Sequence, residues 1–198
     1  AAKIMLVLRS VSVFCGSKVG SNPNYEIEAR KLGSLMAERG VQLVYGGGRI
    51  GLMGALANAV HEGGGEIVGF IPDFLMSLEI ANEGVGKLVV TDSMHVRKAK
   101  MFEISDAAVV LPGGIGTLEE AMEIMTWKQL RQHDKPIVLM NVEGYWDPFL
   151  SLINSVVDGG FAHPKIRELI SVVNSADEVF DALVNAPEPD EQVLTSHL

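Results

Sequence analysis

The feature that most constrains the fold is a regular alternation of short apolar runs with segments of helical periodicity. The runs are rich in Val, Ile and Leu and show no alternation of polar and apolar positions, which is typical of strands covered on both faces. They are Ser10–Cys15, Gln42–Tyr45, Glu66–Ile71, Lys87–Val90, Ala107–Leu111 and Pro136–Met140. The helical segments between them are Asn24–Arg39, Gly51–Glu62, Met94–Ser105 and Thr117–Leu130. This alternation predicts βαβ units, and hence an α/β fold with a doubly wound parallel sheet and helices on both faces.

The rest of the chain extends this single domain rather than adding a second one. Two or three further helices are predicted, around Pro148–Asp158, Pro164–Leu169 and Ala176–Asn185. We expect residues 1–9 to form a lead-in and residues 10–186 to form the domain. Residues 187–198 are acidic and contain proline, so we expect a disordered tail there.

Charge and cysteine content exclude several classes of protein. The chain has 16 Lys and Arg against 25 Asp and Glu, a net charge of −9, which argues against nucleic-acid or anionic-membrane partners. The single cysteine, Cys15, excludes an internal disulfide and a cysteine-based zinc cluster, and it fits a reducing compartment. No apolar run approaches the roughly 18 residues of a membrane span. We therefore expect a cytoplasmic protein.

The first of two glycine clusters follows the predicted strand Gln42–Tyr45 and reads GGGRIGLMG. Its spacing resembles a dinucleotide-binding fingerprint, but no acidic residue ends a strand about 20 residues later. Two interpretations stay open. The glycines could allow close packing of helix and strand, or Gly46, Gly47 and Gly48 could contact a ligand.

The second cluster, PGGIGT, follows the predicted strand Ala107–Leu111 and opens a helix. Glycines let the backbone approach an anion closely, and N–H groups at a helix start point toward it. The segment lacks the Gly-Lys-Ser/Thr of a nucleoside-triphosphate loop. The sequence therefore predicts a monophosphate site here, at the carboxyl end of a strand, where open α/β sheets bind ligands.

Charged residues stand at the starts of two predicted helices. Thr117 and Glu120 are three residues apart and share a helix face directed toward the glycine loop, so Glu120 can orient water or hold sugar hydroxyls. For Glu119 and Glu123 we prefer a capping and helix-dipole role. Cations are disfavoured at a helix start, so Arg97 and its neighbour Lys98 should have an anionic ligand or a nearby carboxylate.

These motifs together resemble the LONELY GUY (LOG) family of cytokinin-activating phosphoribohydrolases. The matching segments are YGGGRIGLMG at Tyr45–Gly54, MHVRK at Met94–Lys98 and PGGIGTLEE at Pro112–Glu120. The resemblance implies a Rossmann-like fold and hydrolysis of the N-glycosidic bond of N6-modified adenosine 5′-monophosphates, with AMP as a second substrate. The products are free base and ribose 5-phosphate. It also implies a homodimer or a higher assembly, and no metal or organic cofactor.

By position, the resemblance makes Arg97 and Glu120 the catalytic pair. Residues that it places against the phosphate and sugar are Gly113, Gly114, Ile115, Gly116, Thr117, Leu118 and Glu119, and further substrate contacts are Glu79, Lys98 and Thr126. An ionised carboxylate can stabilise an oxocarbenium-like transition state. A guanidinium stays protonated, so we expect Arg97 to stabilise charge on the leaving base or the phosphate rather than to donate a proton.

Two alternatives are weighed against this activity. A lysine decarboxylase would need pyridoxal phosphate on a lysine, in a site large enough for that cofactor, and a short single domain makes this remote. A nucleotide- or cofactor-carrier module could use the same glycine loops without turnover. The pair Arg97 and Glu120 distinguishes the enzyme from the carrier, because a carrier has no need of a carboxylate beside the sugar.

Overall fold

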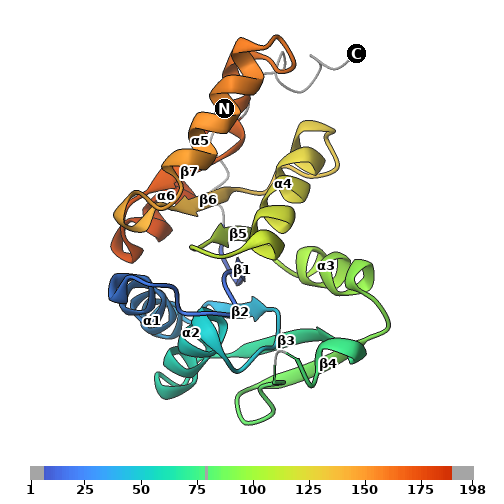
Figure 1. Cartoon of the computed structure of the whole chain (residues 1–198). Coiled ribbons are helices and arrows are strands. Elements are labelled where there is room, and N and C mark those ends of the chain that lie inside the picture. Colours follow the sequence, from blue (N-terminus) through green and yellow to red (C-terminus); the bar gives the residue numbers. More distant parts are fainter. Residues whose placement is uncertain (1–6, 79, 189–198) are drawn as a thin grey trace.

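The computed structural model describes residues 7–78 and 80–188. Within this part of the chain, strands form one sheet in the order β4-β3-β2-β1-β5-β6-β7, and each neighbouring pair is parallel (Figure 1). The strands are β1 (Ser10–Phe14), β2 (Gln42–Tyr45), β3 (Ile67–Pro72), β4 (Lys87–Thr91), β5 (Ala107–Val110), β6 (Ile137–Met140) and β7 (Ser171–Val173). The predicted α/β fold with a doubly wound parallel sheet is confirmed.

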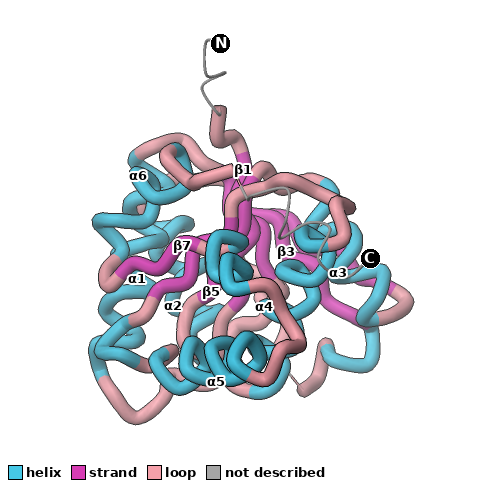
Figure 2. Tube along the Cα trace, turned by 90° about the horizontal axis from the view of Figure 1, so that it is seen from above, coloured by secondary structure: helices cyan, strands magenta, loops and turns pink. Residues whose placement is uncertain are grey.

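Helices cover both faces of the sheet (Figure 2). They are α1 (Pro23–Glu38), α2 (Gly51–Glu62), α3 (Met94–Glu103), α4 (Ile115–Gln129), α5 (Asp147–Asp158) and α6 (Val179–Val184). Buried side chains of α1, α2 and α6 form one apolar core with the sheet, and those of α3, α4 and α5 form a second core on the opposite face. Successive strand residues alternate between the two cores, as Val13 and Phe14 of β1 do.

The chain order of the strands reverses direction beside β1, which lies between β2 and β5. The loops that follow β1 and β5 therefore leave the sheet toward opposite faces, and a crevice forms between them at the carboxyl edge. These two loops are joined by a hydrogen bond of 3.0 Å, donated by the Gly16 N–H to the Pro112 carbonyl. Ligands of open α/β sheets bind at such a switch point.

Two elements differ from the sequence-based expectation. A seventh strand, β7, pairs with β6 through Val138 and Ser171, although no strand was predicted there. It has three residues, and its central Val172 is 43% exposed, so it carries little apolar signal. The predicted helix at Pro164–Leu169 is a run of 3₁₀ turns. Most of the predicted lead-in and tail lies outside the described residues, and the division into three segments stays a prediction.

Every helix in the described part of the chain is too short or too polar to cross a bilayer. This finding concerns residues 7–78 and 80–188 alone.

The C-terminal end of α4 contains a buried lysine whose pKa is lowered. Lys128 is 3% exposed, and its Nζ donates a hydrogen bond of 3.0 Å to the carbonyl of Lys135. Burial lowers the pKa of Lys128 to about 8, and attraction to Asp134 offsets part of that effect. The ammonium form is thus less favourable in the folded protein than in the unfolded chain.

The stability of the protein should therefore depend on pH through Lys128. Between pH 8 and 10.5 the unfolded chain binds the proton of this lysine more tightly, so the free energy of unfolding rises with pH. One pKa unit corresponds to about 1.4 kcal/mol, so wild type should gain roughly 2–3 kcal/mol over Lys128→Met across this range. Denaturant unfolding of both proteins at several pH values measures this gain. The prediction would be contradicted if the free energies of unfolding of the two proteins changed equally with pH.

Candidate active site

A cavity of about 190 Å³ lies at the switch point, at the carboxyl ends of β1, β2 and β5. Four segments that are far apart in the sequence line it. These are Val13–Ser17 after and within β1, Gly46 with Met53, the α3 residues Met94, Arg97 and Met101, and the α4 start with Gly114, Ile115, Gly116, Thr117 and Glu120. The cavity thus brings together Arg97, Glu120 and the second glycine cluster.

Arg97 is held by backbone carbonyls of two neighbouring strands. Its Nε donates to the Phe70 carbonyl at 2.8 Å, and its Nη2 donates to the Gly46 carbonyl at 2.7 Å. Its Nη1 lies 3.7 Å from the Met94 sulfur. The side chain is 3% exposed, so these bonds fix a charged, planar group in a nearly dry setting. The guanidinium consequently reaches the cavity in one orientation.

The start of α4 offers N–H groups to the same cavity. The first N–H groups of an α-helix have no partner within the helix, and the N-cap residue Gly114 has no side chain to bind them. A methyl group built at Gly114 or at Gly116 would meet no atom within 4 Å, so both glycines face open space. Thr117, 4% exposed, and the half-buried Glu120 also line the cavity. This combination is suited to an anion with a carboxylate close by.

Tyr145 supports the glycine loop from the other side. Its hydroxyl donates a hydrogen bond to the Gly113 carbonyl, and its ring packs edge to face on Tyr25 at 5.5 Å between ring centroids. Both rings line a second cavity of about 340 Å³, which shares Gly16, Ser17 and Gly114 with the first. The glycine loop therefore contributes to the lining of both cavities.

The first glycine cluster packs against protein rather than open space. Gly51 has φ +66°, and a methyl group there would lie 2.2 Å from the backbone carbon of Ser17. A methyl group at Gly46 would lie 2.1 Å from Nη2 of Arg97, so a side chain at this position would displace the guanidinium. Gly47 and Gly48 are buried and do not line either cavity. These contacts favour the packing interpretation of the cluster.

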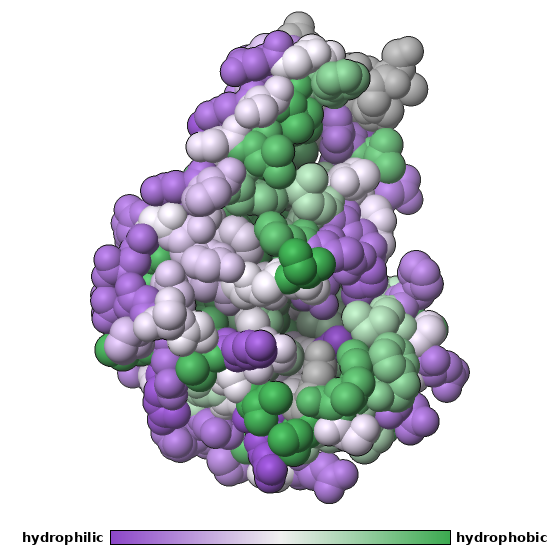
Figure 3. Space-filling view, in the orientation of Figure 1, coloured by the Kyte–Doolittle hydropathy of each residue, from purple (hydrophilic) through white to green (hydrophobic). Residues whose placement is uncertain are grey.

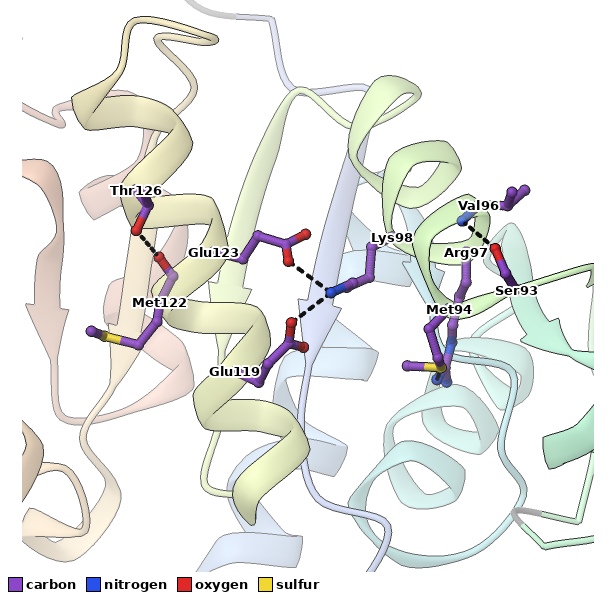
Figure 4. A network of polar contacts seen from close by, with 9 residues as sticks. All are labelled: Ser93, Met94, Val96, Arg97, Lys98, Glu119, Met122, Glu123 and Thr126. Carbon is purple, nitrogen blue, oxygen red and sulfur yellow. Dashed lines mark hydrogen bonds and ion pairs between the residues drawn. The ribbon is translucent and has the colours of Figure 1, made fainter.

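Lys98 points toward α4, as Figure 4 shows. Its Nζ lies 2.6 Å from Oε1 of Glu119 and 2.7 Å from Oε2 of Glu123. Burial lowers the pKa of the Lys98 ammonium, but the hydrogen bonds to Glu119 and Glu123 outweigh this effect and hold that pKa above its usual value. The sequence predicts an anionic ligand or a nearby carboxylate for the cations at the start of α3, and Lys98 has two carboxylates beside it.

The other residues implied by the resemblance lie outside the lining of the cavity or outside the described residues. Thr126 is exposed, and its hydroxyl donates to the Met122 carbonyl at 2.7 Å (Figure 4). Leu118 packs against the second core. Glu79 lies outside the described residues. Roles for these residues in substrate binding stay predictions.

Sequence reasoning missed two groups of residues that line the cavity. Gly16 and Ser17 follow β1 and line both cavities, and the rule that ligands bind beyond the carboxyl ends of strands could have found them. The sulfur-containing side chains of Met53, Met94 and Met101 form an apolar, polarisable part of the lining. No local pattern marks them, because methionine at helical spacing usually belongs to a core.

Comparisons with known proteins identify the family. The family model described as "Possible lysine decarboxylase" matches residues 53–183. The chain is 46% identical over 187 residues to the cytokinin riboside 5′-monophosphate phosphoribohydrolase LOG3 of Arabidopsis thaliana, covering 94% of this chain and 87% of that protein. It is 47% identical over 171 residues to LOG of Oryza sativa subsp. japonica, covering 86% and 71%. The chain belongs to the LOG family.

Solved structures place this LOG family chain in a wider fold group. The Moco carrier protein of Chlamydomonas reinhardtii superposes with a TM-score of 0.66 at 20% identity, covering 97% of this chain and 100% of that one. The molybdenum cofactor binding protein of Rippkaea orientalis gives 0.64 at 20% identity, covering 89% and 95%. Likeness at this identity shows the Rossmann-like fold alone.

Proposed function

We propose that this LOG family chain hydrolyses the N-glycosidic bond of N6-modified adenosine 5′-monophosphates to free base and ribose 5-phosphate, with AMP as a second substrate. The observation that supports this most is one cavity lined by Arg97, Glu120 and the open helix start at Gly114–Thr117. The names of the 46% and 47% identical relatives agree with it. The proposed reaction needs a phosphate site, a carboxylate near the sugar and a cation near the base.

The 5′-phosphate would bind at the start of α4. The N–H groups there and the helix dipole favour an anion, and Gly114 and Gly116 leave room for it to approach. Glu120 follows one turn later and lines the same cavity, so the ribose would lie between the phosphate and this carboxylate. Arg97 and the methionine side chains would then face the base.

In the chemical step, water adds to C1′ of the ribose as the bond from C1′ to the base nitrogen breaks. The carboxylate of Glu120 stabilises the positive charge that develops on the sugar and accepts the proton of the attacking water. The electron pair of the broken bond leaves with the base, and the guanidinium of Arg97 stabilises that negative charge. The base then takes a proton from solvent, and Glu120 releases to solvent the proton that it accepted, so its carboxylate is restored.

The direct test is to incubate the purified chain with isopentenyl-AMP and with AMP, and to separate free base from nucleotide. Release of base and ribose 5-phosphate in equal amounts is the expected result. A chain that binds these nucleotides, as followed by calorimetry, but releases no base would instead be a carrier on the same fold.

The phosphate site makes a specific prediction for Gly116→Ala. The added methyl group meets no protein atom within 4 Å, and alanine is a better helix former than glycine, so the thermal midpoint should stay the same or rise. The methyl group would occupy space that the phosphate uses, so KM should rise about tenfold, equal to about 1.4 kcal/mol of binding. Steady-state kinetics and thermal melts measure both quantities. An unchanged KM would place the phosphate elsewhere.

We also propose that the chain forms a homodimer or a higher assembly in the cytoplasm. Large apolar side chains are exposed on α4, on α5 and just beyond it, including Ile115 at 81%, Leu152 at 57% and Phe161 at 89%. Figure 3 shows hydrophobic residues in a band from the part where α5 lies to the middle of this face. Sedimentation velocity should give at least twice the mass of one chain, and Leu152→Glu should lower it. A monomer at micromolar concentration would overturn this proposal.

A further inference from the structure

We propose that Tyr145 is a positioning residue for the phosphate site. Its hydroxyl holds the peptide between Gly113 and Gly114 so that the Gly114 N–H faces the first cavity, and it does so without contacting the substrate. This inference rests on the proposed function, because it concerns the same phosphate at the start of α4. It adds a residue to which the family resemblance gives no role.

The peptide between Gly113 and Gly114 has little constraint from its own segment. The peptides on either side of it are each held by a backbone hydrogen bond of 3.0 Å, one from the Gly16 N–H to the Pro112 carbonyl and one from the Leu118 N–H to the Gly114 carbonyl. The peptide in between turns about ψ of the first glycine and φ of the second, and neither residue has a Cβ that limits these angles. A contact from outside the loop can therefore set its orientation.

Tyr145 supplies such a contact. Its hydroxyl donates a hydrogen bond to the Gly113 carbonyl. Peptide bonds in the described part of the chain are all trans, so the C=O and the N–H of one peptide point in opposite directions. Gly113 and Tyr145 line the second cavity and not the first, whereas Gly114 lines both. A carbonyl held toward Tyr145 thus turns the Gly114 N–H toward the first cavity, where it can donate to an anion.

Tyr145 is itself fixed by elements other than α4. Its N–H donates to the Val142 carbonyl at 3.0 Å, and the next N–H, of Trp146, donates to Oδ1 of Asn141 at 2.7 Å. Its ring packs edge to face on Tyr25 of α1 and on Trp146, with ring centroids 5.5 and 4.9 Å apart. The hydroxyl is therefore presented to the glycine loop by the β6–α5 connection and by α1.

The first test measures phosphate binding in Tyr145→Phe, which removes the hydroxyl and keeps the ring. The side chain is 36% exposed, so this variant should fold. A hydrogen bond to a charged group corresponds to at least about tenfold in affinity. The Kd for inorganic phosphate, measured by calorimetry, and KM for AMP should therefore rise about tenfold. The phosphate is remote from the breaking bond, so kcat should stay within about twofold of wild type.

The matched control is Tyr25→Phe. It removes the hydroxyl of the neighbouring ring in the second cavity and keeps the packing between the two rings. The affinity for inorganic phosphate and KM for AMP should both match wild type.

Nuclear magnetic resonance shows whether the peptide itself is released. Glycine labelled with ¹³C at the carbonyl and with ¹⁵N at the amide gives a carbonyl-to-amide correlation only for peptides between consecutive glycines, which are 46–47, 47–48, 63–64, 64–65, 113–114 and 159–160. In ligand-free Tyr145→Phe the 113–114 signal should broaden or split, because the peptide then samples more than one orientation. The other signals, and every signal of Tyr25→Phe, should stay as in wild type.

The outcomes separate this inference from the proposed function. Wild type that binds inorganic phosphate but releases no base from AMP would reject the hydrolase, while weaker phosphate binding and a broadened 113–114 signal in Tyr145→Phe would still support the positioning role. Weaker phosphate binding with an unchanged signal would indicate that Tyr145 contacts the phosphate directly, and would overturn the inference. Equal phosphate affinity in Tyr145→Phe and wild type would overturn it as well, whatever the activity.

Discussion

Glu120→Gln is expected to lower kcat for isopentenyl-AMP and AMP about 10³-fold, within the range for loss of a catalytic acid–base or charge-stabilising group. The substitution keeps the shape of the side chain and removes its charge, so nothing would stabilise the positive sugar or take the proton of the attacking water. In the proposed binding mode the substrate phosphate lies elsewhere, at the start of α4, so KM should change much less than kcat. Steady-state kinetics with base release as the readout measures both parameters.

The control for this prediction is Glu103→Gln, at the exposed end of α3 and away from the cavity. It removes the same charge and should leave kcat and KM unchanged. Base release by Glu120→Gln at the wild-type rate would remove Glu120 from the mechanism.

Arg97→Lys is expected to lower kcat about 10²-fold or more, although the positive charge is kept. A lysine cannot reproduce the two bonds that the guanidinium donates to the Phe70 and Gly46 carbonyls, at 2.8 and 2.7 Å, while also facing the base. The same change leaves a buried carbonyl without its donor, which costs about 1–3 kcal/mol and should lower the thermal midpoint. Kinetics must therefore be measured well below that midpoint, on protein shown to be folded by circular dichroism.

A stability loss in Arg97→Lys without loss of kcat would leave Arg97 as a structural residue alone. The matched comparison is Met94→Leu, which removes the sulfur 3.7 Å from Nη1 and keeps the two carbonyl bonds. We expect Met94→Leu to retain kcat within about threefold, because a volume-conserving apolar change is well tolerated.

The fold was largely predictable because short apolar runs and segments of helical periodicity alternate regularly along the sequence. Buried parallel strands give continuous apolar runs, and six of the seven strands in the part of the chain that the structure describes were found from those runs. The exception, Ser171–Val173, is a three-residue edge strand with an exposed central residue, so pairing with β6 determines it rather than its own pattern. The 3₁₀ turns before it share the helical spacing of apolar residues, which explains the helix predicted there.

The candidate site was predictable where one segment contains its whole signal, and not where it depends on contacts between segments. The PGGIGT segment indicates an anion site by itself, because glycines and a helix start occur together. The partners of Lys98 lie 21 and 25 residues away on another helix, so the sequence shows their charges but not their pairing. The role of Gly16 and Ser17 likewise depends on β1 lying beside β5.

The carbonyl of Gly16 has a consequence for the length of ligand that the crevice can accept. It accepts hydrogen bonds from the N–H groups of Leu52 and Met53, at 3.0 and 3.4 Å. Two N–H groups in the first turn of α2 therefore already have a backbone partner. A pyrophosphate-bridged compound such as a dinucleotide would have to displace both of these hydrogen bonds before it could bind a phosphate at the start of α2. We therefore expect the crevice to favour compact mononucleotides over NAD-like molecules. The glycine spacing of Gly46–Gly51 resembles the fingerprint of dinucleotide-binding proteins, but we do not expect it to bind a dinucleotide here.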